Sequence, residues 1–259
     1  MKEHRFSRME LLVGPSAMAQ LATVSVAVFG IGGVGSYAVE ALARAGIGCL
    51  TLVDFDDICV TNINRQLHAL DTTVGRSKVE VMAERCRRIN PDCRVLPRQQ
   101  FFQAETAREL LAPGYDYVLD CIDHITAKLH LIESCIKNRL PVISSMGAAN
   151  KLDPTRVRVG DISTTEKCRL ARIIRKELRR RGIMSGVQTV YSTEEFRPLA
   201  VESAVCAEDH RYQNRDEKRR PGSNQRVPLG SSSYIPPIFG LTMAGVVVQQ
   251  LTGENSSTG

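Results

Sequence analysis

No two of the eight cysteines in this chain of 259 residues form a Cys-x-x-Cys pair. The paired thiolates of a zinc ribbon are therefore missing, and the scattered spacing also argues against a disulfide framework. The five histidines do not cluster at metal-ligand spacing either. The first ten residues are charged and contain no apolar run, which argues against a secretory signal. We therefore predict a protein of the reducing cytoplasm that holds no structural zinc.

A long apolar run that could span a membrane is also missing, although Val227–Gly253 contains no charged residue. Prolines interrupt the first half of this stretch and leave Ile238–Leu251 as a helix candidate of about 20 Å. That length falls short of the roughly 30 Å hydrocarbon core of a bilayer. We predict a buried C-terminal helix whose start is set by Pro237, and no membrane span.

The most informative segment is a buried strand after Val24 that runs into a glycine-rich loop, followed by a helix from Val34. The glycines permit a tight turn, let main-chain N–H groups approach an anion, and allow the helix to pack closely on the strand. They are Gly30, Gly32, Gly33 and Gly35. The next strand ends at Asp54, where a carboxylate can bind ribose hydroxyls. The pattern predicts a nucleotide site, and the alternative is a helix turn that binds nothing.

Strands and helices alternate up to Ala149, which predicts an α/β, Rossmann-like, mostly parallel sheet with helices on both faces. We expect helices over 75–89, 104–111 and 126–138, and strands over 93–96, 117–121 and 141–145. The remainder is expected to form a C-terminal α+β elaboration with strands over 155–162 and 187–191. We divide the chain into a nucleotide-binding core, 1–150, and an extension, 151–259, within one structural unit. Residues 208–226 are expected to form a long charged surface loop.

The positive charge is concentrated in one expected helix. The formal net charge is +6, and the segment Lys167–Arg181 is rich in Lys and Arg with Glu177 as its one acidic residue. Its apolar residues recur at helical spacing, so one face can dock on the protein while the arginines point outward. The alternatives are a surface for a polyanion such as a nucleic acid and a merely solvated helix face.

Amide and guanidinium donors follow the expected ribose site. Asn64, Arg65 and Gln66 come shortly after Asp54, and Lys78 lies on the next helix. Several donors of this kind suit a triphosphate, whereas the nicotinamide of a dehydrogenase cofactor needs an apolar slot. The sequence therefore favours ATP over a dinucleotide.

With these residues the sequence resembles the adenylating enzymes of the HesA/MoeB/ThiF superfamily, which are related to ubiquitin-activating enzymes and to bacterial activators of sulfur-carrier proteins. The matching segments are Arg5–Arg8, Gly30–Gly35, Asp54–Asp56, Asn62–Gln66, Gly75–Lys78 and Asp120–Asp123. The resemblance implies that a carboxylate attacks the α-phosphate of ATP, pyrophosphate leaves, and an acyl-adenylate remains.

The resemblance also implies which side chains contact ATP. These are Asp54, Asp56, Asn64, Arg65, Gln66 and Lys78. Asp54 would hold the ribose, while Asn64, Arg65 and Lys78 would hold the phosphates. Arg65 and Lys78 would also be catalytic.

Two further catalytic residues are implied by the resemblance, each with a plainer alternative. Asp123 would coordinate Mg²⁺ or orient the reacting groups, and its alternative role is to cap the helix at Thr126. Arg8 would reach the γ-phosphate from the partner subunit of a homodimer, and its alternative is a surface arginine.

The second half of the chain resembles one branch of this family. Activators of sulfur-carrier proteins commonly carry two Cys-x-x-Cys pairs, which this chain lacks. Asp161–Arg172, Leu178–Ile183 and Val190–Glu194 instead resemble the threonylcarbamoyladenosine dehydratases, which act on transfer RNA. That likeness implies ring closure of a threonylcarbamoyl adenosine beside the anticodon.

The resemblance to enzymes that act on tRNA implies that the basic helix binds tRNA phosphates. The residues expected to do so are Arg169, Arg172, Arg175, Arg179 and Arg180. A loop over 211–226 would order on the anticodon arm.

Alternatives remain at this point. The second hypothesis is an adenylating activator of a small sulfur-carrier protein, and the third is a nucleotide-binding regulatory module without turnover. Cys168 and Cys206 are candidate nucleophiles, because relatives form thioesters and Lys167 and Arg169 flank the first thiol; the alternative is a packing role. A monovalent cation and a sulfur-transfer or cysteine desulfurase partner are left open.

Overall fold

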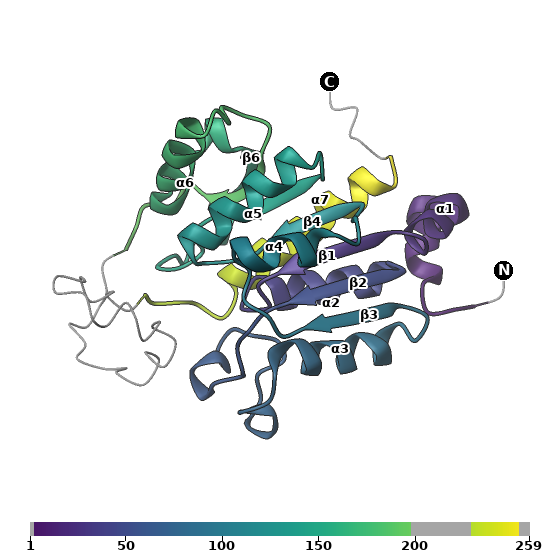
Figure 1. The fold of residues 1–259 in the computed structure, drawn as a ribbon. Coiled ribbons are helices and arrows are strands. Elements are labelled where there is room, and N and C mark those ends of the chain that lie inside the picture. Colours follow the sequence, from purple (N-terminus) through teal and green to yellow (C-terminus); the bar gives the residue numbers. More distant parts are fainter. Residues whose placement is uncertain (1–2, 198–228, 254–259) are drawn as a thin grey trace.

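The computed structural model describes residues 3–197 and 229–253, whose strands form one seven-stranded sheet (Figure 1). The strand order is β3-β2-β1-β4-β5-β7-β6. Neighbouring strands are parallel except β6 and β7, which pair antiparallel. The prediction of a mostly parallel α/β sheet with a C-terminal elaboration is confirmed.

The elements lie close to the expected positions. The strands are β1 (Ser25–Phe29), β2 (Cys49–Val53), β3 (Arg94–Arg98), β4 (Tyr117–Asp120), β5 (Val142–Ser145), β6 (Val157–Asp161) and β7 (Gln188–Ser192). The helices are α1 (Ser7–Leu21), α2 (Gly35–Ala45), α3 (Lys78–Ile89), α4 (Ala104–Leu111), α5 (Ile125–Lys137), α6 (Arg169–Arg180) and α7 (Ile235–Leu251).

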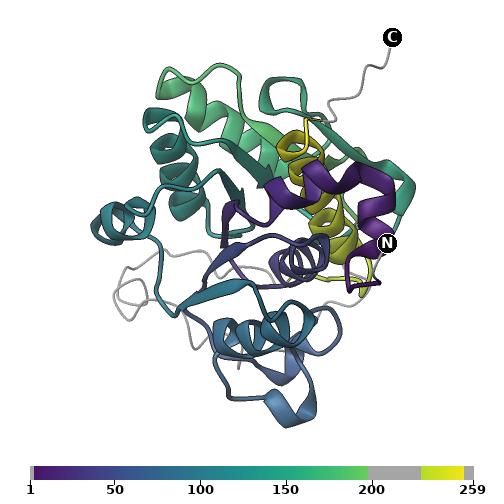
Figure 2. The same ribbon diagram turned by 90° about the vertical axis from the view of Figure 1, so that its right-hand side faces the viewer.

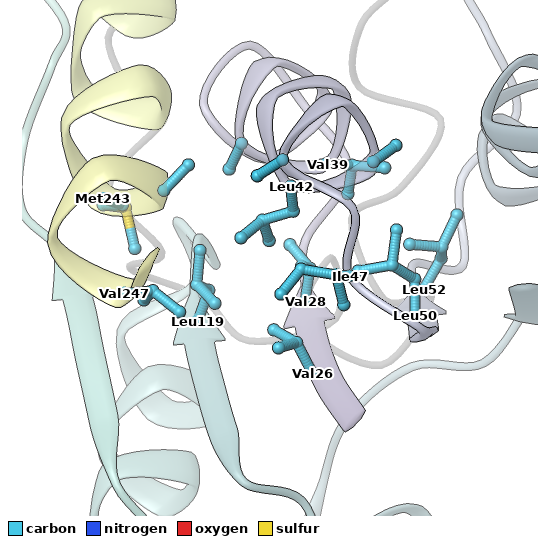
Figure 3. Packing of buried hydrophobic residues seen from close by; sticks show 14 of the residues in the cluster. Val26, Val28, Val39, Leu42, Ile47, Leu50, Leu52, Leu119, Met243 and Val247 are labelled. Carbon is cyan, nitrogen blue, oxygen red and sulfur yellow. The ribbon is translucent and has the colours of Figure 1, made fainter. Parts of the chain in front are cut away.

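Helices cover both faces of the sheet, because alternate residues of each buried strand point to opposite sides (Figures 1 and 2). On one face the core is formed by α2, α3 and α7 against the strands. Figure 3 shows Met243 and Val247 of α7 on the same side as Leu42 of α2, with Val247 beside Leu119 of β4. On the other face α4 and α5 pack on side chains of β1 and β4. The C-terminal helix is thus part of the central core.

The strand order reverses between β1 and β4. The loops after these two strands therefore lead in opposite directions at the carboxyl edge of the sheet. In open α/β sheets, ligands bind in the crevice at such a point. The glycine loop leaves β1 here, and the segment ending at Asp123 leaves β4. The topology therefore brings two of the expected nucleotide-binding segments together.

Two helices differ from expectation. Helix α1 was not anticipated; Gly14 within it has a non-helical conformation with φ +81°, and the chain resumes a helix after it. Helix α7 begins at Ile235 rather than at Pro237. The prediction that Pro237 sets the start was wrong, because Pro236 and Pro237 both fit in the first turn, where no helical N–H bond is lost.

None of the helices in residues 3–197 and 229–253 has the length and apolarity needed to cross a bilayer.

The close contact between α7 and α2 is a testable feature of this fold. A Cβ added to Gly240 would lie 2.2 Å from the carbonyl oxygen of Val34, whereas a Cβ on Gly245 of the same helix would meet nothing within 4 Å. We expect Gly240→Ala to lower the free energy of unfolding by about 1–3 kcal/mol, because main-chain atoms must separate. Gly245→Ala should raise it by a few tenths to about 1 kcal/mol through helix propensity. Urea denaturation of both variants measures this, and equal effects would contradict the packing.

Candidate functional site

The glycine loop after β1 has the tight geometry that its sequence predicts. Gly30 has φ +87°, and a Cβ there would lie 2.8 Å from the main chain of Cys121. A Cβ on Gly35 would lie 1.8 Å from the carbonyl oxygen of Gly30. Side chains are therefore excluded at both positions, and the N-terminus of α2 is presented at the crevice with no side-chain cap. Such an N-terminus attracts anions.

Asp54 joins the loop to the end of β2. Its Oδ2 accepts the N–H of Ile31 at 2.6 Å, and its Oδ1 accepts the N–H of Asp56 at 2.9 Å. Each carboxylate oxygen can accept a second hydrogen bond. Asp54 thus shapes the loop and retains acceptor capacity for a ribose hydroxyl.

Lys78 reaches the same place from the start of α3. Its Nζ donates to Oδ2 of Asp56 at 2.6 Å, and the side chain is only 7% exposed. Burial opposes the ammonium charge, but Asp54, Asp56 and Asp123 together outweigh it, so the pKa of Lys78 lies above its usual value. Burial and the neighbouring carboxylates also raise the pKa of Asp56, against the pull of Lys78. Both directions reflect an excess of carboxylates over ammonium groups around Lys78.

Arg65, Gln66 and Asn64 lie beside the glycine loop as expected. A Cβ on Gly33 would be 3.4 Å from Cγ of Arg65, and one on Gly32 would be 3.8 Å from Nε2 of Gln66. Gln66 is buried, and its Oε1 has no hydrogen-bond partner in the described structure. An unpaired buried acceptor at this place fits a site that a ligand completes.

The side chain of Asn64 is partly committed to other groups. Its Nδ2 donates to the carbonyl of Ser231 at 3.0 Å, and its Oδ1 accepts from Nη1 of Arg65 at 2.9 Å. Asn64 therefore orients Arg65 and ties it to the segment before α7.

Asp123 follows β4 and is exposed at the carboxyl edge, within electrostatic reach of Lys78 and Asp56. The proposed cap role is not seen, because the residue that caps α5 is His124, whose Nδ1 accepts the N–H of Ala127 at 3.3 Å. The carboxylate of Asp123 is therefore available to a ligand in the crevice.

A buried ionic cluster that the sequence did not reveal lies beneath Asp123. Oδ2 of Asp120 accepts from Nζ of Lys128 at 2.7 Å and from Oγ of Ser144 at 2.6 Å, and all three residues are fully buried. Oδ1 of Asp120 holds the N–H of Ile122 at 3.1 Å. Because a buried charge needs such partners, the cluster fixes the turn that carries Asp123. The only signal was a lysine among the apolar residues of α5.

His68 is a second residue that we missed. It is 2% exposed, and its Nε2 lies 2.7 Å from the carbonyl oxygen of Ile31 in the glycine loop. Burial is the main reason that the pKa of His68 falls to about 4, and the charge of Lys78 adds to it. The imidazole is therefore neutral near pH 7 and carries its proton on Nε2, which donates to the carbonyl.

Three rings that follow the carboxyl ends of three strands lie together. Phe101 meets Phe55 edge to face with centroids 4.9 Å apart, and meets His124 in the same way at 5.7 Å. They follow β3, β2 and β4, respectively. The rings provide an apolar wall beside Asp54 on which a base can pack.

The residues present also fit a Mg²⁺ ion accompanying a triphosphate. No cluster of three or more His, Cys, Asp or Glu in the described residues forms a metal cage. Mg²⁺ usually binds through one or two carboxylates plus substrate phosphates. Oδ1 of Asp56 is buried and has no hydrogen-bond partner among the described residues, and the excess carboxylate charge around Lys78 favours a cation. Asp123 and Asp56 would hold the ion.

Arg8 lies away from this crevice. Its neighbour Arg5 donates to the carbonyl of Ile89 at the end of α3, and Phe6 packs near Gly46 at the end of α2. The glycine loop is at the other end of α2, about 16 Å along that helix. Arg8 therefore does not reach the glycine loop of its own chain, and α1 lies across α7 at the opposite edge (Figure 2).

The basic residues of helix α6 fall into two groups, those exposed to solvent and those bonded to other protein groups. Arg172 and Arg179 are exposed and share one helix face with Lys176. Arg169 is exposed at the start of the helix, with its guanidinium 3.7 Å from the ring centroid of Phe196. These four residues form the basic stripe.

The remaining two arginines of that helix are committed within the protein. Arg175 donates from Nη1 to the carbonyl oxygen of Thr165 at 2.6 Å and braces the loop before α6, so we leave it out of the basic stripe. Arg180 pairs with Glu177 at 2.6 Å.

Of the two candidate nucleophiles, Cys168 lies in the described part of the chain. Cys168 is buried, and its Sγ accepts the N–H of Ala171 at the start of α6. A capping and packing role is the plainer reading of that environment. Cys206 and the expected loop over 208–226 lie outside the described residues.

The lowered pKa of His68 predicts a pH effect on stability. In the unfolded chain its pKa is near 6.5, so between pH 6.5 and pH 4 the unfolded state binds more protons than the folded state. The free energy of unfolding should therefore fall by up to about 3 kcal/mol as the pH drops through this window. Denaturant titrations of the parent and His68→Gln at several pH values measure it. Parallel pH profiles for the two proteins would contradict the prediction.

The chain is similar to known proteins over nearly its whole length. The tRNA threonylcarbamoyladenosine dehydratase of Bacillus subtilis is 45% identical over 248 residues, covering 96% of this chain and 94% of that protein. The crystal structure of the Escherichia coli tRNA N6-threonylcarbamoyladenosine dehydratase with AMP has a TM-score of 0.83 at 35% identity, over 96% and 94% of the two chains. Its complex with ATP has a TM-score of 0.81 at 35% identity, over 98% and 96%.

A second type of relative matches less of the chain. The molybdopterin-synthase adenylyltransferase of Salmonella typhimurium is 37% identical over 151 residues, which cover 58% of this chain and 59% of that protein. The family model described as the ThiF family matches residues 6–258. The chain therefore belongs to the ThiF family.

Proposed function

We propose that this protein is an ATP-dependent tRNA threonylcarbamoyladenosine dehydratase. The observation that carries the proposal is the likeness to dehydratases over nearly the whole length of both chains, including the part beyond the nucleotide crevice. The activator of a sulfur-carrier protein is the second candidate, and the relative with a related name matches little more than half of this chain.

The reaction begins with the threonine carboxylate of the modified adenosine. One carboxylate oxygen attacks the α-phosphorus of ATP, and the bond to pyrophosphate breaks. This step needs positioning and charge neutralisation rather than covalent catalysis by the protein. Arg65 and Lys78 supply cationic donors, and the main-chain N–H groups of the glycine loop supply neutral ones. Asp54 holds the ribose.

Ring closure follows without a protein nucleophile. The carbamoyl group of the same nucleoside attacks the activated carbonyl carbon and loses a proton, and AMP leaves with one of the original carboxylate oxygens. The sum is the loss of one water from the nucleoside while ATP becomes AMP and pyrophosphate. The attacking group is already tethered, which makes the step effectively unimolecular. The burial of Cys168 agrees with a reaction that needs no thioester.

Mg²⁺ bound with ATP would neutralise phosphate charge during the attack. Asp123 and Asp56 are the side chains that would hold it, and Lys128 keeps the turn before Asp123 in place through Asp120. A monovalent cation and a cysteine desulfurase partner are compatible with this chemistry, and the reaction as written needs neither.

The basic stripe of α6 is the proposed tRNA contact. Its first residues lie at the carboxyl edge of the sheet, because Cys168 and Leu170 pack against Gly147 after β5. The stripe therefore starts on the same edge as the nucleotide crevice. Exposed arginines and lysines along one helix face suit successive phosphates.

A homodimer is the proposed assembly. Arg8 lies far from the crevice of its own chain, so a role at the γ-phosphate requires a second copy. The exposed leucines Leu11 and Leu12 of α1, which are 67% and 76% exposed, lie close to Arg8 in the sequence.

The deciding experiment is incubation of the protein with ATP, Mg²⁺ and tRNA that carries threonylcarbamoyladenosine, followed by nucleoside mass spectrometry. We expect the nucleoside to lose the mass of one water. Lys78→Met should reduce kcat/KM by about 100-fold or more, because it removes a donor from the phosphates. Lys137→Met, an exposed lysine on α5, is the control and should be unaffected. An unchanged nucleoside mass, with turnover dependent instead on a protein ending in Gly-Gly, would favour the second candidate.

The tRNA surface is tested by charge reversal. Arg172→Glu combined with Arg179→Glu should weaken tRNA binding more than tenfold and lower the slope of log K against log salt by about one to two. Arg88→Glu with Arg108→Glu, two exposed arginines on α3 and α4, changes the net charge equally and is the control. Equal weakening by both pairs would show a net-charge effect and remove the stripe from the interface. ATP binding should be unchanged in both double variants.

A further inference from the structure

One residue of the glycine loop, Ile31, is held through both of its main-chain polar groups. The N–H of Ile31 donates to Oδ2 of Asp54 at 2.6 Å, and the carbonyl oxygen of Ile31 accepts from Nε2 of His68 at 2.7 Å. Both partners come from outside the loop. Ile31 is fully buried, and His68 is 2% exposed.

The hydrogen bond from His68 to the Ile31 carbonyl fixes the direction of the N–H of Gly32. The Ile31–Gly32 peptide is planar and trans, so its C=O and N–H point in opposite directions. With the carbonyl turned toward the buried His68, the N–H of Gly32 is turned away from it. Within the described residues this N–H makes no hydrogen bond to the protein. It is therefore a free donor in the loop that begins α2.

Without the imidazole this peptide could rotate. Glycine tolerates conformations that other residues avoid, so Gly32 places little restraint on the peptide before it. A Cβ at Gly32 would have only one neighbour within 4 Å, Nε2 of Gln66 at 3.8 Å, which leaves space for the movement. Rotation would exchange the free N–H for a carbonyl oxygen, and an anion would be repelled by it.

We propose that His68 is a positioning residue that locks the Ile31–Gly32 peptide, so that the N–H of Gly32 is presented to the phosphates of ATP. This inference rests on the proposed ATP site. It assigns to His68 a role in phosphate binding without direct contact with the nucleotide. The carbonyl oxygen of Ile31 needs a donor at the place of Nε2, which the imidazole N–H of His68 supplies.

Two variants of similar length separate the hydrogen bond from packing. The amide Nε2 of His68→Gln can occupy the place of the imidazole Nε2 and donate, whereas His68→Met fills the space without a donor. We expect His68→Met to weaken ATP and AMP binding about tenfold, the worth of one hydrogen bond to a charged group. Adenosine, which has no phosphate, should bind all three proteins equally. His68→Gln should stay within about threefold of the parent.

The outcomes separate the lock from the proposed ATP site. Equal losses for ATP and adenosine, or equal losses in the two variants, would show a packing role and overturn the proposal. A parent protein that binds no ATP would overturn both the lock and the proposed function. A parent that binds ATP, with a His68→Met variant that binds it as well, would overturn the lock alone.

A measurement on the parent protein keeps the test independent of how well the variants fold. Labelling isoleucine carbonyl carbons and glycine nitrogens selects Ile-Gly pairs in an NMR spectrum, and the sequence holds two, Ile31–Gly32 and Ile47–Gly48. The N–H of Gly48 already donates to the carbonyl of Leu21 and serves as the internal control. We expect AMP to shift the Gly32 signal, adenosine to leave it in place, and neither to move Gly48. A Gly32 signal that responds equally to both ligands would contradict the proposal.

Discussion

The hydrogen bonds of Asp54 are the interaction on which the rest of the site depends. One oxygen holds the glycine loop through Ile31, and the other holds the main chain of Asp56, which in turn binds Lys78. The loop after β1, the end of β2 and the start of α3 are thereby joined through one carboxylate. Arg65 and Gln66 reach the loop from the crossover between these elements. A change at Asp54 would therefore alter several phosphate donors at once.

A second carboxylate, which is fully buried, fixes the main chain on the other side of the crevice. Asp120 is paired with Lys128 and Ser144 and holds the turn that leads to Asp123. Burying these charges is costly unless every partner is in place, so the cluster specifies one arrangement of the turn. The two carboxylates lie at the ends of β2 and β4, on either side of β1, in the strand order β2-β1-β4. The nucleotide site is thus built from rigid strand ends, which suits a reaction that depends on positioning.

Much of this arrangement could be predicted from the sequence, because local patterns carry it. The glycine loop, the donors after Asp54 and the alternation of strands and helices each follow from spacing and residue type. What could not be predicted depends on contacts between distant residues. His68 looks like any loop histidine until the fold places it under Ile31, and Lys128 looks like a surface lysine until Asp120 faces it. Arg175 likewise fits a basic face in the sequence, but in the structure it braces Thr165.

In the proposed reaction, a carboxylate of the tRNA nucleoside attacks the α-phosphate of ATP in the crevice between Gly30 and Asp123. A heavy oxygen isotope can trace this attack. The threonine carboxylate of threonylcarbamoyladenosine in tRNA is labelled with ¹⁸O, and the products of one turnover are analysed by mass spectrometry. Adenylation followed by ring closure predicts one ¹⁸O atom in AMP. Label in inorganic phosphate, with unlabelled AMP or ADP, would show attack at another phosphate and contradict the account.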